Sequence, residues 1–207
     1  MTLLGKSCLK YMIALKPEIE ARGYQLVAFR SAGMGGRAFA DLAAQGSFVV
    51  SGKSRLEAAG LAGIPQIVAP GAVDMVAFAV WGEMSPYYAD RPVYTHNRLI
   101  ASVTTQQDER RRLARMIGHK LSLATGRVTV LMPLLGVEDW DRPGEALHDP
   151  KDLPPLLKSC VLPLPPPATP IELNAHINDT AFAEAVLAVL DGWIAQGIVP
   201  RGQAVPD

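Results

Sequence analysis

Short apolar runs alternate with longer amphipathic segments along the chain. The runs are typical of buried β-strands, and they cover residues 24–29, 47–50, 65–69, 128–132 and 171–173, with 93–95 as a further candidate. Segments with apolar residues at helical spacing lie between them, at residues 8–19, 38–45, 56–61, 105–121 and 179–194. Strands separated by helices of this length predict a parallel sheet with helices on both faces. We therefore expect one α/β domain over residues 1–207, with an open, mostly parallel sheet in a Rossmann-like three-layer arrangement.

Three local signals refine the expected boundaries. Pro17 should kink or divide the first helix, because proline removes a backbone donor and clashes with the preceding turn. Thr105 followed by Asp108 resembles a capping box at the start of a helix. The proline-rich stretch 163–170 is expected to be irregular.

Composition narrows the classes of partner. Twenty basic and twenty acidic residues give no net charge, so the chain has no electrostatic footprint for nucleic acid or for an anionic membrane. The two cysteines, Cys8 and Cys160, are far apart in the sequence, which favours reduced thiols in a cytoplasmic protein. The apolar segment near the N-terminus is too short for a signal peptide or a membrane span. We therefore expect a cytoplasmic protein that binds neither nucleic acid nor membrane.

Polar residues follow the expected strands at the places where ligands bind in open parallel sheets, outside the carboxyl ends. Five such segments occur, at Gly33–Arg37, Gly71–Asp74, His96–Asn97, Gly136–Asp141 and His176–Asp179. Three of the four histidines lie after expected strands, and His119 falls within an expected helix. This distribution predicts a ligand site at the carboxyl edge of the sheet.

The glycine-rich segment Gly33–Ala38 fits the G-x-G-x-x-A form of the dinucleotide fingerprint. No acidic residue ends the next expected strand, which argues against a nicotinamide dinucleotide. Two readings stay open. The backbone amides of Gly33, Gly35 and Gly36 hold a phosphate together with Arg37, or the segment is only a tight turn between a strand and a helix.

The other candidate ligand-binding side chains also follow expected strands: Asp74, His96, Asn97, Asp141, His176, Asn178 and Asp179. Asp74 could bind a ligand hydroxyl or a metal, or it could cap a helix. Either histidine alone could be structural, but their joint placement favours a shared site. No metal is expected, since no pair of candidate ligands has the spacing of known zinc helices. A catalytic nucleophile is not indicated either, because the sequence contains no G-x-S-x-G elbow.

The loop over residues 136–149 is long for a connection without regular structure, which is typical of a lid or a binding loop. Trp140 within it could stack on a ligand ring, or it could pin the loop to the surface.

Five segments taken together resemble the Tm-one-like ATP-binding family, uncharacterised protein family 0261. They are Gly33–Ala38, Gly63–Val76, Tyr94–Asn97, Leu131–Val137 and His176–Asp179, in the family's order over about residues 20–200. The resemblance implies that the chain corresponds to the C-terminal half of a two-domain protein, whose N-terminal Rossmann-like domain is associated with ATP binding. It also implies ATP or another phosphorylated ligand, with magnesium where the ligand is a nucleotide. The connection at Ser51–Ser54 is shorter than the family pattern.

Three functions follow as hypotheses. In the first, the domain binds a small anionic or phosphorylated ligand. Arg37 and the glycine amides hold the anion, and polar residues after the other strands orient it. These residues are His96, Asn97, His176, Asn178 and Asp179, with Asp74 and Asp141 as further candidates. In the second, it is a hydrolase- or lyase-type enzyme in which His176 is a general acid or base oriented by Asp179. In the third, it is an interaction module that pairs with an N-terminal ATP-binding domain or with a second copy of itself.

Overall fold

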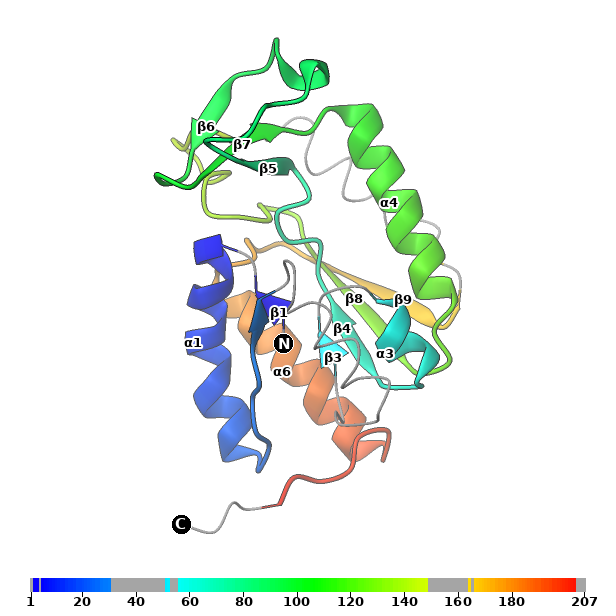
Figure 1. Ribbon diagram of the computed structural model, residues 1–207. Helices are drawn as coiled ribbons and strands as arrows, with labels where there is room; N and C mark the ends of the chain where they lie inside the picture. Colours follow the sequence, from blue (N-terminus) through cyan, green and yellow to red (C-terminus); the bar gives the residue numbers. More distant parts are fainter. Residues whose placement is uncertain are drawn as a thin grey trace.

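The computed structural model describes residues 2–3, 5–30, 51–52, 56–148, 164 and 166–203. Figure 1 shows a main sheet of four parallel strands in the order β3-β4-β8-β9. These strands are β3 (Ser51–Gly52), β4 (Gln66–Val68), β8 (Val128–Pro133) and β9 (Ala168–Leu173). The expected α/β class with an open, mostly parallel sheet is confirmed.

Helices cover both faces of this sheet. On one face lie α1 (Gly5–Ala21) and α6 (Thr180–Ala195), and on the other lie α3 (Glu57–Leu61) and α4 (Gln107–Ser122) (Figure 1). Alternate residues of β8 divide between the two resulting cores, as the twofold period of a strand requires. Leu131 packs with Leu15 of α1 and Phe182 of α6, whereas Val130 and Met132 pack with Leu121 of α4.

The central strand β8 is buried along its whole length. This matches the sequence-based interpretation of 128–132 as a strand covered on both faces, since such strands are continuously apolar. The last helix also begins where expected, with Asp179 as the residue before its first turn.

A three-stranded antiparallel sheet forms a separate layer. It contains β5 (Met75–Ala79), β6 (Val93–Thr95) and β7 (Ile100–Thr104), in the order β5-β7-β6. A short 3-10 helix, Pro86–Tyr88, lies between β5 and β6. Figure 1 shows this sheet at the top of the molecule, where the chain continues from β4. Only β6 was expected from the sequence.

Near the N-terminus, two expectations differ from the structure in part. Of the two effects expected of Pro17, division of the helix does not occur, because α1 continues through it. The residue four positions earlier, Ile13, is 63% exposed, so water can reach the helix surface where proline removes the backbone hydrogen bond. The expected strand 24–29 is also largely irregular: only β2 (Phe29–Arg30) is extended, and it pairs in parallel with β1 (Thr2–Leu3).

Two further boundaries differ from expectation. The helix α4 is capped one residue later than predicted, because the carboxylate of Glu109 accepts the N–H of Gln106 at 2.7 Å. The hydroxyl of Thr105 instead donates to the carbonyl of Val73 at 3.2 Å. Strand β9 begins inside the proline-rich stretch, at Ala168, and its pairing with β8 accounts for the order there.

Other expected elements cannot be compared. The helix 38–45 and the strand 47–50 lie outside the described residues. Ser51 and Gly52, which the sequence assigned to a connection, form β3 and pair with β4. Within the described ranges, none of the helices combines the length and the apolar character needed to cross a bilayer.

Candidate functional site

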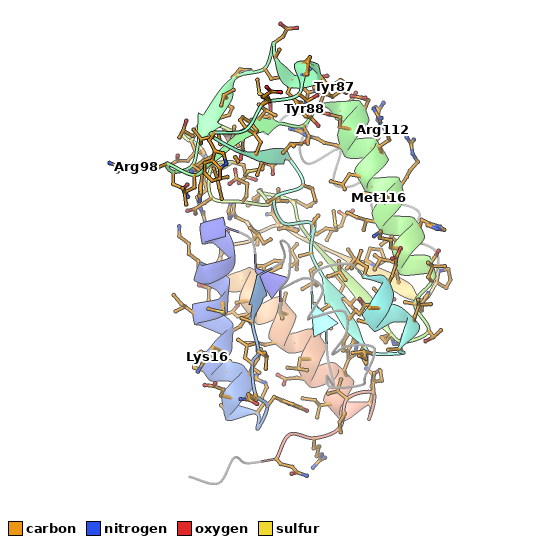
Figure 2. All side chains as sticks on the ribbon, viewed as in Figure 1. Lys16, Tyr87, Tyr88, Arg98, Arg112 and Met116 are labelled. Carbon is orange, nitrogen blue, oxygen red and sulfur yellow. The ribbon has the colours of Figure 1, made fainter. Side chains whose placement is uncertain are left out.

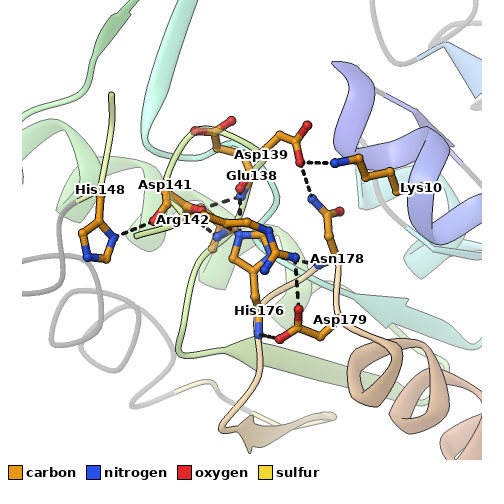
Figure 3. Close-up of polar contacts among 10 residues, drawn as sticks. Lys10, Glu138, Asp139, Asp141, Arg142, His148, His176, Asn178 and Asp179 are labelled. Atoms are coloured by element: carbon orange, nitrogen blue, oxygen red, sulfur yellow. Dashed lines mark hydrogen bonds and ion pairs between the residues drawn. The ribbon is translucent and has the colours of Figure 1, made fainter. Parts of the chain in front are cut away.

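The loops that follow β8 and β9 lie side by side at the carboxyl edge of the parallel sheet (Figure 3). Backbone hydrogen bonds continue between them past the ends of the strands. The amide of Leu134 donates to the carbonyl of Leu173, that of Leu135 to Ala175, and that of Ile177 to Gly136. The polar side chains of the two loops are therefore held in one network.

His176 is the centre of this network. Its side chain is 2% exposed. Its Nε2 atom lies 2.8 Å from both the carbonyl oxygen of Glu138 and Oδ1 of Asp141, and its Nδ1 accepts the backbone N–H of Asn178 at 3.0 Å. Because Nδ1 is an acceptor, the ring is the neutral tautomer that carries its proton on Nε2.

Asp141 closes the turn around His176. Its Oδ2 accepts the backbone N–H groups of Val137 at 2.5 Å and of Glu138 at 3.3 Å, while Oδ1 accepts from His176. Its side chain is fully buried, and its backbone carbonyl accepts a hydrogen bond from the Nδ1–H of His148 at 2.8 Å. The carboxylate therefore holds the loop after β8 against the loop after β9.

The rim of the network carries charged side chains. Arg142 donates to Oδ1 of Asp179 at 3.0 Å, and Lys10 of α1 donates to Oδ1 of Asp139 at 2.6 Å. Asp139 also accepts from the amide nitrogen of Asn178 at 3.2 Å. Burial opposes ionisation of Asp179, but the amide of His176 and the guanidinium of Arg142 outweigh it and lower the pKa of this carboxyl.

Glu138 is the most unusual ionisable group of the site. It is 5% exposed, and burial raises its pKa from 4.5 to about 8, with the carboxylates of Asp74 and Asp141 adding to the rise against a hydrogen bond from the amide of Trp140. Its Oε1 atom is inaccessible and has no hydrogen-bond partner among the described residues. This glutamate therefore carries a proton at neutral pH.

Replacing Glu138 by glutamine is expected to remove a pH dependence of stability. The folded protein keeps a proton on Glu138 between pH 4.5 and about 8, where the unfolded chain has lost it, so the contribution of this group to stability falls as the pH rises through that window. Between pH 5 and pH 8.5 the melting temperature of the parent should fall by an additional amount on the order of 10 °C that Glu138→Gln abolishes.

Circular dichroism melting curves at the two pH values provide this measurement. Glu145→Gln is the matched control, because Glu145 is an exposed glutamate on the same loop. A fall in melting temperature that is equal in the parent and in Glu138→Gln would contradict the assignment of a proton to Glu138.

The structure brings together four of the residues that the sequence singled out: Asp141, His176, Asn178 and Asp179. His96 lies on the β6–β7 hairpin, with its ring centroid 5.1 Å from that of Trp140, so Trp140 joins this hairpin to the loop after β8. Asn97 serves the hairpin turn, where its Oδ1 accepts the amides of Leu99 and Ile100.

Asp74 is buried in the connection between β4 and β5. The interpretation of this residue as a helix cap was wrong, because the element that follows it is a strand. The segment with Gly33, Gly35, Gly36 and Arg37 lies outside the described residues.

Among the members of the site that sequence reasoning missed are Lys10, Glu138, Asp139 and Arg142. The signal for Glu138 was present, since it lies in the loop directly after a buried strand. Lys10 gave no such signal, because it comes from the opposite end of the chain. In the part of the chain that the structure describes, no three His, Cys, Asp or Glu side chains are placed to share a metal ion.

Comparison with known proteins relates this arrangement to a family. Residues 45–194 match the Uncharacterised protein family (UPF0261) C-terminal domain. A UPF0261 protein of Brucella melitensis is 46% identical over 98% of this chain and 53% of its own length. A UPF0261 protein of Clostridium tetani is 33% identical over 83% of this chain and 47% of its own length.

A plant protein is also similar. The ToMV resistance protein Tm-1 of Solanum lycopersicum is 30% identical over 84% of this chain and 26% of its own length. The chain thus spans about half the length of the bacterial relatives and about a quarter of the plant relative. On the match to the family's domain and the identity to these relatives, the chain belongs to the UPF0261 family and contains its C-terminal domain.

Proposed function

We propose that this domain binds a small ligand carrying a phosphate or another anionic group at the carboxyl edge of its parallel sheet. The observation that supports the proposal is the convergence of two loops on one buried network, which pre-organises polar groups where open parallel sheets bind ligands. Lys10 and Arg142 supply positive charge at its rim.

The anionic group itself is assigned to the glycine-rich segment. Gly33, Gly35 and Gly36 offer backbone amides, and Arg37 offers a guanidinium, directly after β2. Lys10 and Arg142 each already face a carboxylate, which reduces the net attraction that they provide for an anion. ATP with magnesium is one ligand of this class, by the family resemblance.

Calorimetric titration with ATP, with and without magnesium, and then with small phosphorylated metabolites tests the proposal. We expect saturable binding that Arg37→Ala weakens by at least about tenfold. Arg127→Ala is the control, because Arg127 is exposed next to the opposite, amino end of β8. Failure of every phosphorylated compound to bind, or binding that is indifferent to Arg37→Ala, would overturn the proposal.

The hydrogen bonds of His176 favour a positioning role over general acid or base catalysis. Both ring nitrogens are engaged within the protein, and the group that donates to Nδ1 is a backbone amide. A proton could be accepted at Nδ1 only after the hydrogen bond from the Asn178 backbone N–H is broken. A catalytic His176–Asp179 pair, acting as in a hydrolase or lyase, stays a hypothesis from the sequence.

A second candidate function, docking of another protein segment, is favoured by the surface of the antiparallel sheet. Exposed apolar side chains occur on this sheet and its connections: Val80, Trp81, Tyr87, Val93 and Leu99. Trp81 is 74% exposed, and Figure 2 shows Tyr87 and Tyr88 at this end of the molecule. Val80 and Leu99 are neighbours, since the amide of Val80 donates to the carbonyl of Leu99, and exposed apolar residues that lie together mark interaction surfaces more often than isolated ones do.

The segment we propose for this surface is the remaining half of the family protein, since the Brucella relative is nearly twice as long as the matched region. That remaining segment, produced separately, should be captured by this chain, and Trp81→Ser with Leu99→Ser should abolish capture. Met116→Ser is the matched control, because Met116 is 51% exposed on α4, away from the antiparallel sheet. Capture that survives the double substitution would exclude this surface.

A further inference from the structure

Strand β5 (Met75–Ala79) lies at an outer edge of the antiparallel sheet, because the strand order is β5-β7-β6. It belongs to an uncharged apolar run, Met75–Trp81, that contains neither proline nor glycine. Folded proteins usually protect an edge strand with a charge, a proline or a bulge, since its unpaired backbone groups can pair with another chain. Strand β5 has none of these three features, and its register with β7 is continuous.

The other edge strands among the described residues carry such protection or are very short. Strand β9 contains Pro170 and Glu172, and β6 directly follows Pro92. Strands β1, β2 and β3 have two residues each. Within the described ranges, β5 is therefore the edge best suited to pair with another strand.

Backbone hydrogen bonds at the two ends of β5 define which of its groups face β7. The amide of Thr105 donates to the carbonyl of Asp74, and the amide of Val80 donates to the carbonyl of Leu99. Opposite residues in an antiparallel pair alternate between hydrogen-bonded and non-hydrogen-bonded positions. In the continuous register, the even-numbered residues of β5 therefore direct their N–H and C=O groups towards β7.

The odd-numbered residues of β5, Met75, Ala77 and Ala79, direct their backbone groups to the outer edge. The carbonyl of Ala79 accepts the amide of Gly82 at 2.9 Å. The other outward groups have no backbone partner in the part of the chain that the structure describes. Ala77, at the middle of the strand, is exposed. The edge thus offers unpaired donors and acceptors beside a small side chain.

We infer that β5 pairs with β5 of a second copy of this chain about a twofold axis, which joins two three-stranded sheets into one continuous sheet. In an antiparallel pair centred on Ala77, the outward N–H and C=O groups of Ala77 bond to the same groups of the partner copy. Val76 of each copy then lies opposite Phe78 of the other. A β-branched residue opposite an aromatic one is a favourable cross-strand pair.

Charge favours a second copy as the occupant of this edge. At a twofold axis a strand meets itself, so charged residues of one sign along the edge would be brought together and would repel. The run 75–81 contains no charged residue and meets this condition. The inference goes beyond the proposed function, because it does not involve the ligand site. It also uses backbone groups, whereas the surface assigned above to the remaining half of the family protein consists of exposed side chains.

Sedimentation velocity of the purified chain over a wide range of concentrations measures assembly. We expect a species of twice the chain mass of 22.2 kDa. Ala77→Lys should weaken dimerisation at least about tenfold, because two lysines would face each other at the axis. Thr95→Lys is the matched control, since it adds the same charge at an exposed position on β6, the opposite edge of the sheet. Melting curves establish that both variants are folded.

Amide hydrogen exchange followed by NMR tests the pairing in the parent protein. The amide of Ala77 should exchange at least about tenfold more slowly where the dimer predominates than where the monomer does. The amide of Phe78 faces β7 and should be protected in both states. A chain that is monomeric at every concentration, or a dimer in which the Ala77 amide stays unprotected, would overturn the inference. Protection of Ala77 that appears only with the remaining half of the family protein would assign the edge to that segment and would equally exclude a second copy.

Discussion

Asp141→Ala is expected to lower the free energy of unfolding by about 4 kcal/mol. The carboxylate accepts two backbone amides, from Val137 and Glu138, and the Nε2–H of His176. All of these groups are buried, so alanine would leave two amide donors without their acceptor and a cavity beside the imidazole. Urea denaturation followed by circular dichroism measures the change.

Asp139→Ala is the control for this prediction. Asp139 is the same residue type on the same loop, but its side chain is 22% exposed and its partners are a lysine and an amide at the rim. Exposed or partly exposed ion pairs contribute about 1 kcal/mol or less, so this variant should stay close to the parent. If the two variants lost equal stability, Asp141 would not hold the two loops together.

Gly136→Ala is expected to cost about 3 kcal/mol or more and to disturb the site as well. Gly136 has a φ of 140°, which side-chain-bearing residues rarely adopt. An added Cβ would lie 2.4 Å from Oδ1 of Asp141 and 2.4 Å from Cδ2 of His176. The methyl group would therefore push apart the two side chains whose hydrogen bond closes the network.

Gly144→Ala is the control for Gly136→Ala, because it places alanine at a positive φ without a steric clash of the added Cβ. Gly144 lies in the same loop with a φ of 89°, but a Cβ there would meet no atom within 4 Å. It should cost about 1 kcal/mol, the ordinary penalty for alanine at positive φ. Denaturation curves of the two variants, together with the NMR signal of the His176 ring, provide the comparison. Equal losses would show that Asp141 and His176 can make room.

Elements with strong local patterns were predicted well. Strand β8 follows from the continuous apolar run 128–132, and α6 follows from an aspartate before an apolar helical face. Strands β5 and β7 of the antiparallel sheet were missed because they contain small residues, such as Ala77 and Ser102, that give little local strand signal. They become strands by pairing with each other across a long connection, and such context outweighs local β-propensity.

The candidate site was predicted in part. The rule that ligands bind beyond the carboxyl ends of parallel strands selected Asp141, His176, Asn178 and Asp179, and the structure brings these four together. The rule did not distinguish a histidine that is enclosed by hydrogen bonds from one that is open to a ligand. It also did not select Glu138, whose raised pKa depends on burial and on nearby carboxylates.

The sequence by itself determined the class of this protein, because apolar periodicity and residue order act over a few neighbouring positions and specify strands, helices and their alternation. Only the tertiary structure decided which polar groups are satisfied. The Nε2 atom of His176 finds its partners 35 and 38 positions away, and Lys10 finds Asp139 at a separation of 129. The burial of the Glu138 carboxyl and its proximity to Asp74 arise only in the folded chain, so no local pattern could encode the raised pKa, although Asp139 and Asp141 are also close in the sequence.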